Sequence, residues 1–241
     1  MALLGLPLAA LSGLMMVVAA LGNRTQLLPV IIALPLLGLG ILGAIVATLV
    51  SFTRLIITLV RQSPNAHPAP QALTLVLGLI LLAIPGSLIY AAVASGAPPI
   101  HDVSTDTEDV PQFVDALPKR ARALNPTEYG GPSVAAQQHR AFPDLQTVVL
   151  HESPEQAFDR ALAAVREMGW ELISANRQTG RIEATDTTFW FGFKDDVVVR
   201  VKAGPEGSRI DIRSLSRVGG GDTGTNARRI RALVQRLMDR R

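Results

Sequence analysis

The 241-residue sequence contains no cysteine and only three lysines. Without cysteine the protein has no disulfide, no thiolate metal site and no cysteine nucleophile. The sequence also lacks the phosphate-binding pattern GxxxxGK[ST], the metal-binding spacings HxH and HExxH, and the nucleophile elbow GxSxG. These absences disfavour nucleotide hydrolysis and metal-dependent catalysis, and we expect neither a cofactor nor a metal.

Acidic residues are missing from the first hundred positions. All 20 acidic residues follow Ile100, whereas only Arg24, Arg54 and Arg61 of the 23 basic residues precede it. The other 20 basic residues balance the 20 acidic ones, so the chain after Ile100 is neutral overall. A neutral domain lacks the basic face that nucleic acid requires, and we expect no nucleic-acid partner.

The first hundred positions contain three apolar runs, at residues 2–21, 27–50 and 71–95. Each is long enough to cross a hydrocarbon core of ~30 Å as a helix. The sequence therefore predicts a membrane region, residues 1–96, with three transmembrane helices in a lipid bilayer. A cleaved signal peptide is the alternative for the first run, but the run lacks the positive n-region of such peptides.

The loops between these runs predict the orientation. The first loop carries Arg24, and the second, residues 51–70, carries Arg54 and Arg61. Because basic loops favour the cytoplasm, the N-terminus is expected inside and the chain after Ser95 outside. In a bacterium this predicts a multi-pass inner-membrane protein of the cell envelope with a periplasmic C-terminal domain.

Residues 97–146 alternate proline, threonine and aspartate with little periodicity. They predict an extended segment that wraps across a domain, with a solvated linker as the alternative.

Residues 147–241 then show strand and helix patterns. The expected order is the strand TVVL, a helix from Ser153, the strands WELISAN, RIEATDTT, FWFGF, DDVVVRVKA and SRIDIRSLS, and a final helix from about Thr223. Consecutive strands with short turns predict an α+β fold, an antiparallel sheet with helices on one face.

Three blocks of this half, PPIHDVSTD, IEATDTTFWFGFKDDVVVRV and IDIRSLSRVGGGDTGTNARRIRAL, occur in this order. Together they resemble a bacterial and plastid family known as domain of unknown function 1499, over residues 98–237. The resemblance implies one family domain, residues 97–241, and often an envelope or thylakoid location. It implies no activity and no catalytic residues.

The loop GGGDTG, residues 219–224, has two interpretations. It is either a tight turn capped by Asp222 or an anion site, in which backbone N–H groups at a helix start bind phosphate or a lipid headgroup. The turn is preferred because an aspartate already occupies the position of the anion. The candidate residues for anion or partner binding are Arg217, Asp222, Asn226, Arg228, Arg229, Arg231 and Trp190.

Specific contacts are expected around this loop. Asp222 should accept from backbone N–H groups two or three residues on, and Asn226 should tie the loop to the preceding strand. Arg229 or Arg231 should reach the acidic segment 102–109 and hold it against the domain. Trp190 should point away from Phe189 and Phe191, toward lipid, a partner or the acidic segment.

No catalytic constellation emerges, so a non-enzymatic function is favoured: a membrane-anchored envelope protein whose C-terminal domain binds a partner protein or a lipid component such as anionic lipid. The alternative is a membrane-tethered hydrolase or lipid-processing enzyme. That alternative requires Ser214 or an aspartate to converge with a histidine. As neighbours on a strand, Asp195 and Asp196 would point to opposite faces, and only in a turn could both enter one site. They are expected to form the turn between FWFGF and VVVRV.

Overall fold

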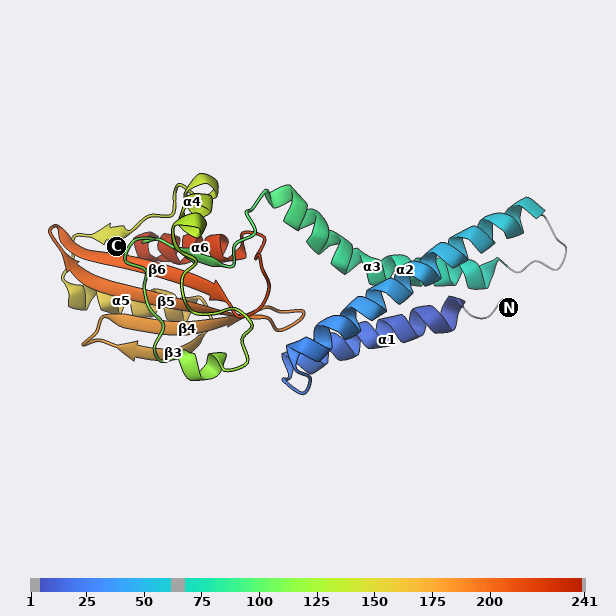
Figure 1. The fold of residues 1–241 in the computed structure, drawn as a ribbon, viewed down its shortest axis with the longest axis horizontal. Helices are drawn as coiled ribbons and strands as arrows, with labels where there is room; N and C mark the ends of the chain where they lie inside the picture. The colour runs from blue at the N-terminus through green and yellow to red at the C-terminus, as the bar shows by residue number, and fades with distance from the viewer. Residues whose placement is uncertain (1–4, 62–67, 240–241) are drawn as a thin grey trace. The chain divides into compact units, whose positions relative to one another are not determined.

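The computed structural model describes residues 5–61 and 68–239. The chain divides into two compact units, residues 1–94 with 189–192 and residues 95–188 with 193–241. The first unit contains the apolar helices, and the second, here called the sheet domain, contains a six-stranded sheet (Figure 1).

Three apolar helices form the first unit: α1 Gly5–Arg24, α2 Val30–Arg61 and α3 Ala69–Ser95. Each is long and apolar enough to span a membrane. The expected loop at residues 51–70 is wrong in its first part, because α2 continues to Arg61. The sequence from Leu55 to Val60 stays apolar and contains neither proline nor glycine, so nothing ends the helix there.

Small residues bring α1 and α2 together. A Cβ added to Gly43 would lie 2.4 Å from Ser12 Oγ, and one added to Gly40 would lie 2.7 Å from Met16 Cγ. The two helices therefore approach closely at these two glycines, whereas Gly38 faces open space.

The sheet domain confirms the predicted α+β class. Its strands are β1 Asp102–Ser104, β2 Val148–Leu150, β3 Glu171–Asn176, β4 Arg181–Thr187, β5 Lys194–Gly204 and β6 Gly207–Ser216. All pair antiparallel, in the order β1-β6-β5-β4-β3, and β2 also pairs with β6.

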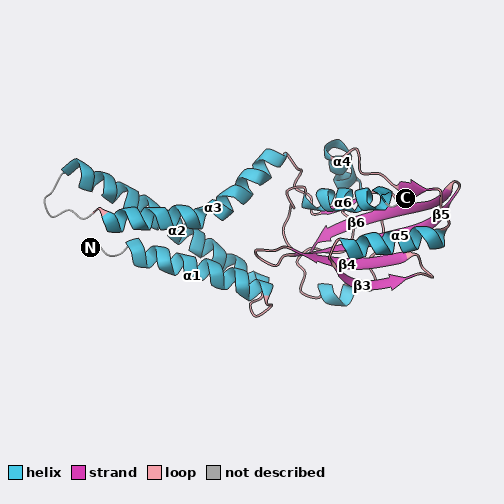
Figure 2. Cartoon of the chain, turned by 180° about the vertical axis from the view of Figure 1, so that it is seen from behind, coloured by secondary structure: helices cyan, strands magenta, loops and turns pink. Residues whose placement is uncertain are grey.

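Two helices, α5 Pro154–Glu167 and α6 Thr225–Asp239, cover one face of the sheet (Figure 2). Ser153 and Gln156 form a reciprocal capping box at the start of α5. The core lies between these helices and the alternate strand residues that point toward them, which include Val197, Val199, Val201, Ile210 and Ile212.

The opposite, outer face of the sheet is covered by residues 105–127, the green strand-free segment in Figure 1. This segment contains one short 3-10 helix, Leu117–Arg120, and packs Phe113 and Ala116 against Val198 and Leu215. The chain around it also contains elements that its composition did not predict, namely β1 and the helix α4 Gly131–Ala141.

The expected strand FWFGF is wrong. Residues 188–193 form the turn between β4 and β5, closed by a hydrogen bond from Thr188 N–H to the Phe193 carbonyl at 2.8 Å. Asp195 and Asp196 consequently lie inside β5 rather than in a turn. Gly192, at φ +73°, supplies the left-handed residue that reverses the chain.

Candidate functional site

Asp222, in the glycine-rich loop before α6, caps the start of this helix. Its Oδ1 accepts from the backbone N–H of Gly224 at 2.9 Å, and its Oδ2 accepts from that of Asn226. These bonds reach two and four residues on, because α6 begins only at Thr225. The carboxylate thus occupies the place where an anion would meet these N–H groups.

Asn226 ties this loop to the preceding strand, as predicted. Its Nδ2 donates to Ser216 Oγ at 2.9 Å and to the carbonyl of His101 at 3.1 Å. Its Oδ1 accepts from Ser214 Oγ at 2.6 Å and from Arg229 Nη1 at 2.7 Å. Asn226 is fully buried, so these bonds connect the residue before β1, the strand β6 and the helix α6 inside the domain.

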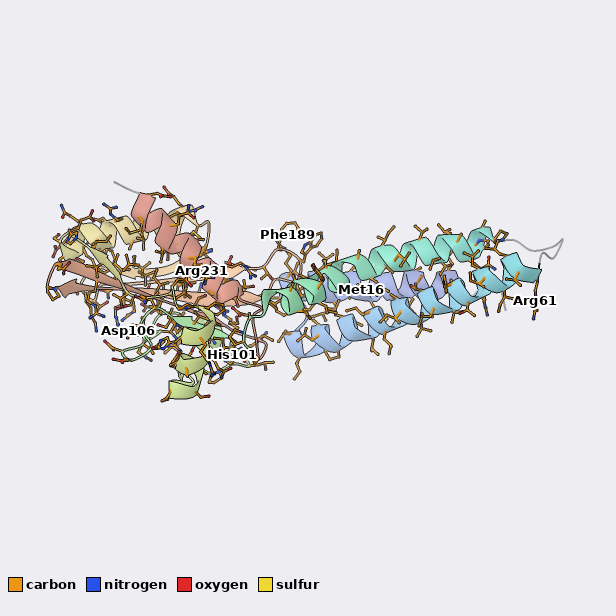
Figure 3. All side chains as sticks on the ribbon, turned by 90° about the horizontal axis from the view of Figure 1, so that it is seen from above. Met16, Arg61, His101, Asp106, Phe189 and Arg231 are labelled. Carbon is orange, nitrogen blue, oxygen red and sulfur yellow. The ribbon has the colours of Figure 1, made fainter. Side chains whose placement is uncertain are left out.

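The arginines of α6 bind other carboxylates than predicted. Arg229 pairs with Asp186 and Asp195, and Arg231 pairs with Asp144. Figure 3 shows the reason: Arg231 and Asp106 lie on opposite sides of the sheet, so the α6 arginines do not hold the acidic segment. Arg229 is also buried.

The remaining candidate arginines are also occupied. Arg217 donates to both carboxylate oxygens of Asp196, at 2.8 and 2.9 Å, and to the Lys119 carbonyl at 2.8 Å. Arg228 donates to the Thr223 carbonyl and to Thr225 Oγ1 at the start of its own helix. Binding of an external anion would have to compete with these internal acceptors.

Two buried carboxylates of this region are shifted in opposite directions. Burial tends to raise the pKa of Asp196, but hydrogen bonds from Arg217, Thr185 and Arg120 outweigh it and lower the pKa below its usual value. Burial raises the pKa of Asp222, against the opposing N–H bonds from Asn226 and Gly224. The difference arises because Asp196 faces two guanidinium groups, whereas Asp222 accepts mainly from neutral amides.

Strand arginines, rather than helix arginines, hold the acidic segment. Arg213 is fully buried and donates to both carboxylate oxygens of Asp102, at 2.7 and 2.9 Å. It also donates to the carbonyls of Pro111 and Thr127. Arg200 pairs with Asp106, also on the outer face. The alternating pattern of β6 did not distinguish Arg213 from an exposed arginine.

Glu183 of β4 is the second anchor of this segment. Its fully buried carboxylate accepts three backbone N–H groups, from Val114 at 2.8 Å, Asp115 at 3.2 Å and Ala116 at 2.7 Å. Three consecutive amides around one carboxylate form a concave anion-binding arrangement that is filled from within the protein.

The groups considered for catalysis are used structurally. Ser214 Oγ bonds to Asn226 and Arg229. Asp195 and Asp196 point to opposite faces of the sheet, Asp195 toward Arg229 of α6 and Asp196 toward Arg217 and Arg120. Over residues 5–61 and 68–239 no group of three or more His, Asp or Glu side chains is arranged to hold a metal ion.

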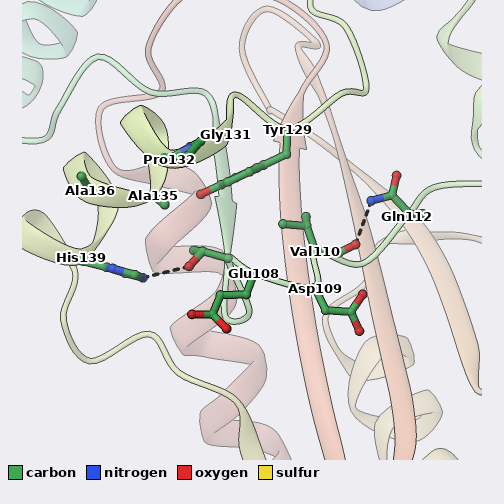
Figure 4. A pocket seen from close by; sticks show the side chains of 11 residues that line it. Glu108, Asp109, Val110, Gln112, Tyr129, Gly131, Pro132, Ala135, Ala136 and His139 are labelled. Carbon is green, nitrogen blue, oxygen red and sulfur yellow. Dashed lines mark hydrogen bonds between the residues drawn. The ribbon is translucent and has the colours of Figure 1, made fainter.

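An open groove of about 740 Å³ lies between residues 107–112 and α4 (Figure 4). Its apolar lining comes from Val110, Pro132, Ala135 and Ala136, and the ring of Tyr129 crosses it. Its polar lining consists of Thr107, Glu108, Asp109, Gln112 and His139. His139 Nε2 is held by Thr107 Oγ1 at 3.0 Å across the groove.

Tyr129 gives this groove an unused hydrogen-bond donor. Its Oη is shielded from solvent and has no hydrogen-bond partner among the described residues. Burial and the nearby negative charge of Asp102 raise the pKa of Tyr129 to about 12, so the hydroxyl is protonated at neutral pH. The sequence prediction missed this groove. The available signal was Pro132, because proline is typical of the first turn of a helix.

The predicted aromatic candidate, Trp190, lies at the tip of the β4–β5 turn. Its exposed fraction is 62%, and that of Phe189 is 71%. The two rings meet edge to face, with centroids 5.2 Å apart. Trp190 is therefore not covered by the acidic segment, which was one of its expected environments.

One comparison with known proteins gave a match for this chain. A family model described as "Protein of unknown function (DUF1499)" matches residues 102–237, more than half of the 241-residue chain. This range begins at β1 and ends in α6, so it includes the sheet, the segment on its outer face and the groove. The comparison with curated proteins gave no match.

Proposed function

We propose a binding function for this chain, which belongs to the DUF1499 family: it is a membrane-anchored protein whose sheet domain binds a segment of a partner protein. Three helices long and apolar enough to span a membrane precede the domain and provide the anchor. The groove between residues 107–112 and α4 is the observation that carries the proposal.

The lining of the groove supports a peptide as its ligand. Apolar side chains of its lining, among them Val110, Ala135 and Ala136, provide contact area, and the ring of Tyr129 adds an aromatic surface. Glu108 adds a negative charge to the rim, whereas Asp109 is paired with Lys202 and Arg200. The charge of Glu108 favours a segment with basic residues and disfavours an anionic lipid headgroup. A partner protein is therefore preferred over a lipid component at this place.

The cellular location forms part of the proposal. Arg54 and Arg61, near the C-terminal end of α2, support a cytoplasmic position for that end of the helix, and thus a sheet domain in the periplasm of a bacterial inner-membrane protein. The partner is then a second protein of the cell envelope, located where the tethered domain can reach it.

Site-specific photocrosslinking in the full-length, membrane-inserted protein tests the proposal. A photoreactive amino acid in place of Ala136, which is exposed in the groove, should give one discrete crosslinked product. Ser133 is exposed on the same helix but does not line the groove, so the same probe there should give none.

A second substitution makes the test specific for the groove. Ala135→Trp fills the groove and should abolish the product formed at position 136 without changing the melting temperature of the protein. Equal products from positions 133 and 136, no product from either, or a product that persists in the filled variant would refute the proposal.

A further inference from the structure

The turn between β4 and β5 carries an aromatic pair that the fold does not bury. At its base, Phe193 N–H donates to Thr188 Oγ1 at 2.9 Å, which holds the turn closed. Beyond this base, Phe189 and Trp190 are 71% and 62% exposed, whereas Phe191 is only 7% exposed. Two adjacent, largely exposed aromatic rings are unusual on a water-facing surface. They indicate that the pair contacts an apolar environment outside the protein.

The strand register shows at which end of the sheet domain this pair lies. Asp102, where the chain joins the sheet, pairs with Leu215 of β6, and Leu215 pairs with Asp196 near the start of β5. The chain therefore joins the sheet at the end where β5 begins, which is also the end that carries the β4–β5 turn.

The connection to the last apolar helix is short. α3 ends at Ser95 and β1 begins at Asp102. Seven residue steps reach at most ~25 Å when fully extended, at about 3.3–3.6 Å per residue. Asp102, at the end of the sheet where the β4–β5 turn lies, is thus kept within that reach of the last residue of α3.

We infer that Phe189 and Trp190 insert into the interfacial region of the bilayer that anchors the chain, and that this contact docks the sheet domain on the membrane surface. Tryptophan and other aromatic rings are favoured in this region, because one part of the ring meets acyl chains while its polar group stays hydrated. The pair is a docking surface for lipid that is separate from the groove at α4.

Quenching of tryptophan fluorescence by brominated lipid tests this inference on the full-length chain. The chain has two tryptophans, Trp170 and Trp190. With Trp170→Phe, only Trp190 emits. After reconstitution into phosphatidylcholine vesicles, its emission should be blue-shifted and should be quenched when the lipid carries bromine at the shallow 6,7 positions of the acyl chain.

The opposite turn of the sheet provides the matched control. Glu206 is exposed between β5 and β6, at the other end of the same strands. In a Trp170→Phe, Trp190→Phe, Glu206→Trp variant, the emission should be that of a water-exposed indole and should not be quenched.

A further variant separates insertion from simple proximity. Phe189→Ser leaves Trp190 in place but removes its aromatic neighbour, and should shift the emission back toward that of the Glu206→Trp control. The inference is overturned if Trp190 shows no quenching in vesicles that contain only this protein, if both reporters are quenched equally, or if Phe189→Ser changes nothing.

Discussion

At the scale of single residues, the sheet domain neutralises its buried charges with specific partners. Arg213 is fully buried and forms a salt bridge with Asp102, and Asp196 forms salt bridges with both Arg120 and Arg217. A buried ion that loses its partner destabilises a protein by about 3–5 kcal/mol, so the stability of the domain depends on both members of each pair. These arginines therefore serve the fold.

Asp222 allows a direct test of the loop before α6. Asp222→Ala should lower the free energy of unfolding of the sheet domain by about 0.5–2 kcal/mol, because two backbone N–H groups lose their acceptor. Asp222→Asn keeps an acceptor oxygen and should retain most of the stability. Thermal denaturation of the full-length variants measures both effects.

The same measurement in the presence of inorganic phosphate distinguishes the two interpretations of this loop. A capped turn gives equal responses to phosphate in the wild type and in Asp222→Ala. An anion site would give an unchanged melting temperature without phosphate, and a larger phosphate-dependent increase in Asp222→Ala, since a competing negative charge is gone.

At the scale of elements, the segment 105–127 behaves as a third layer without regular secondary structure. It has few backbone bonds of its own, and Glu183 and Arg213 supply acceptors and donors for its main chain instead. The groove depends on this layer, because residues 107–112 form one of its walls. Loosening the segment should therefore affect partner binding as well as stability.

Glu183→Gln should detach the middle of this segment. The amide group replaces one carboxylate oxygen by a donor, which leaves a buried backbone N–H at 114–116 unsatisfied and costs about 1–3 kcal/mol. We expect faster amide hydrogen exchange at residues 112–118. Glu171→Gln is the control, since Glu171 is exposed and pairs with Lys119 at the surface, where a salt bridge contributes about 0–1 kcal/mol. Equal exchange in the two variants would contradict this role of Glu183.

At the scale of the whole molecule, the acidic residues are confined to the part of the chain after Ile100. The three helices have no acidic side chain, and every carboxylate lies in the part that folds around the sheet. Because the sheet domain is neutral overall, its location depends on the loops between the helices rather than on its own charge.

The orientation is tested by fusing reporters to the C-terminus. Alkaline phosphatase, which is active only after export, should be active, and a reporter that requires the cytoplasm should be inactive. The physical reason is the excess of basic residues, Arg54 and Arg61, on the side of the second loop. The reverse pair of activities would show that the sheet domain is cytoplasmic, and would remove the envelope partner from the proposed function.

The local patterns of the sequence were sufficient for the three apolar helices, for α5 and α6, for most strands and for the caps. Apolar runs of twenty residues, a capping box at Ser153 and an aspartate before α6 act over a few residues, so they are visible without a fold. The same reasoning failed for FWFGF, where aromatic alternation indicated a strand and the chain forms a turn instead. An exposed aromatic tip and a buried strand share the same local pattern, and only their surroundings differ.

Only the tertiary structure decided which charges meet. Arg213 and Asp102 are 111 positions apart in the chain, and Arg231 pairs with Asp144 because α6 and the acidic segment lie on opposite sides of the sheet. The groove is likewise formed by Tyr129, α4 and residues 107–112, none of which has a distinctive pattern alone. The sequence by itself determined which segments are apolar, extended or helical, because those properties depend on neighbours along the chain. Pairing and burial depend on neighbours in space, which the folding of the sheet brings together.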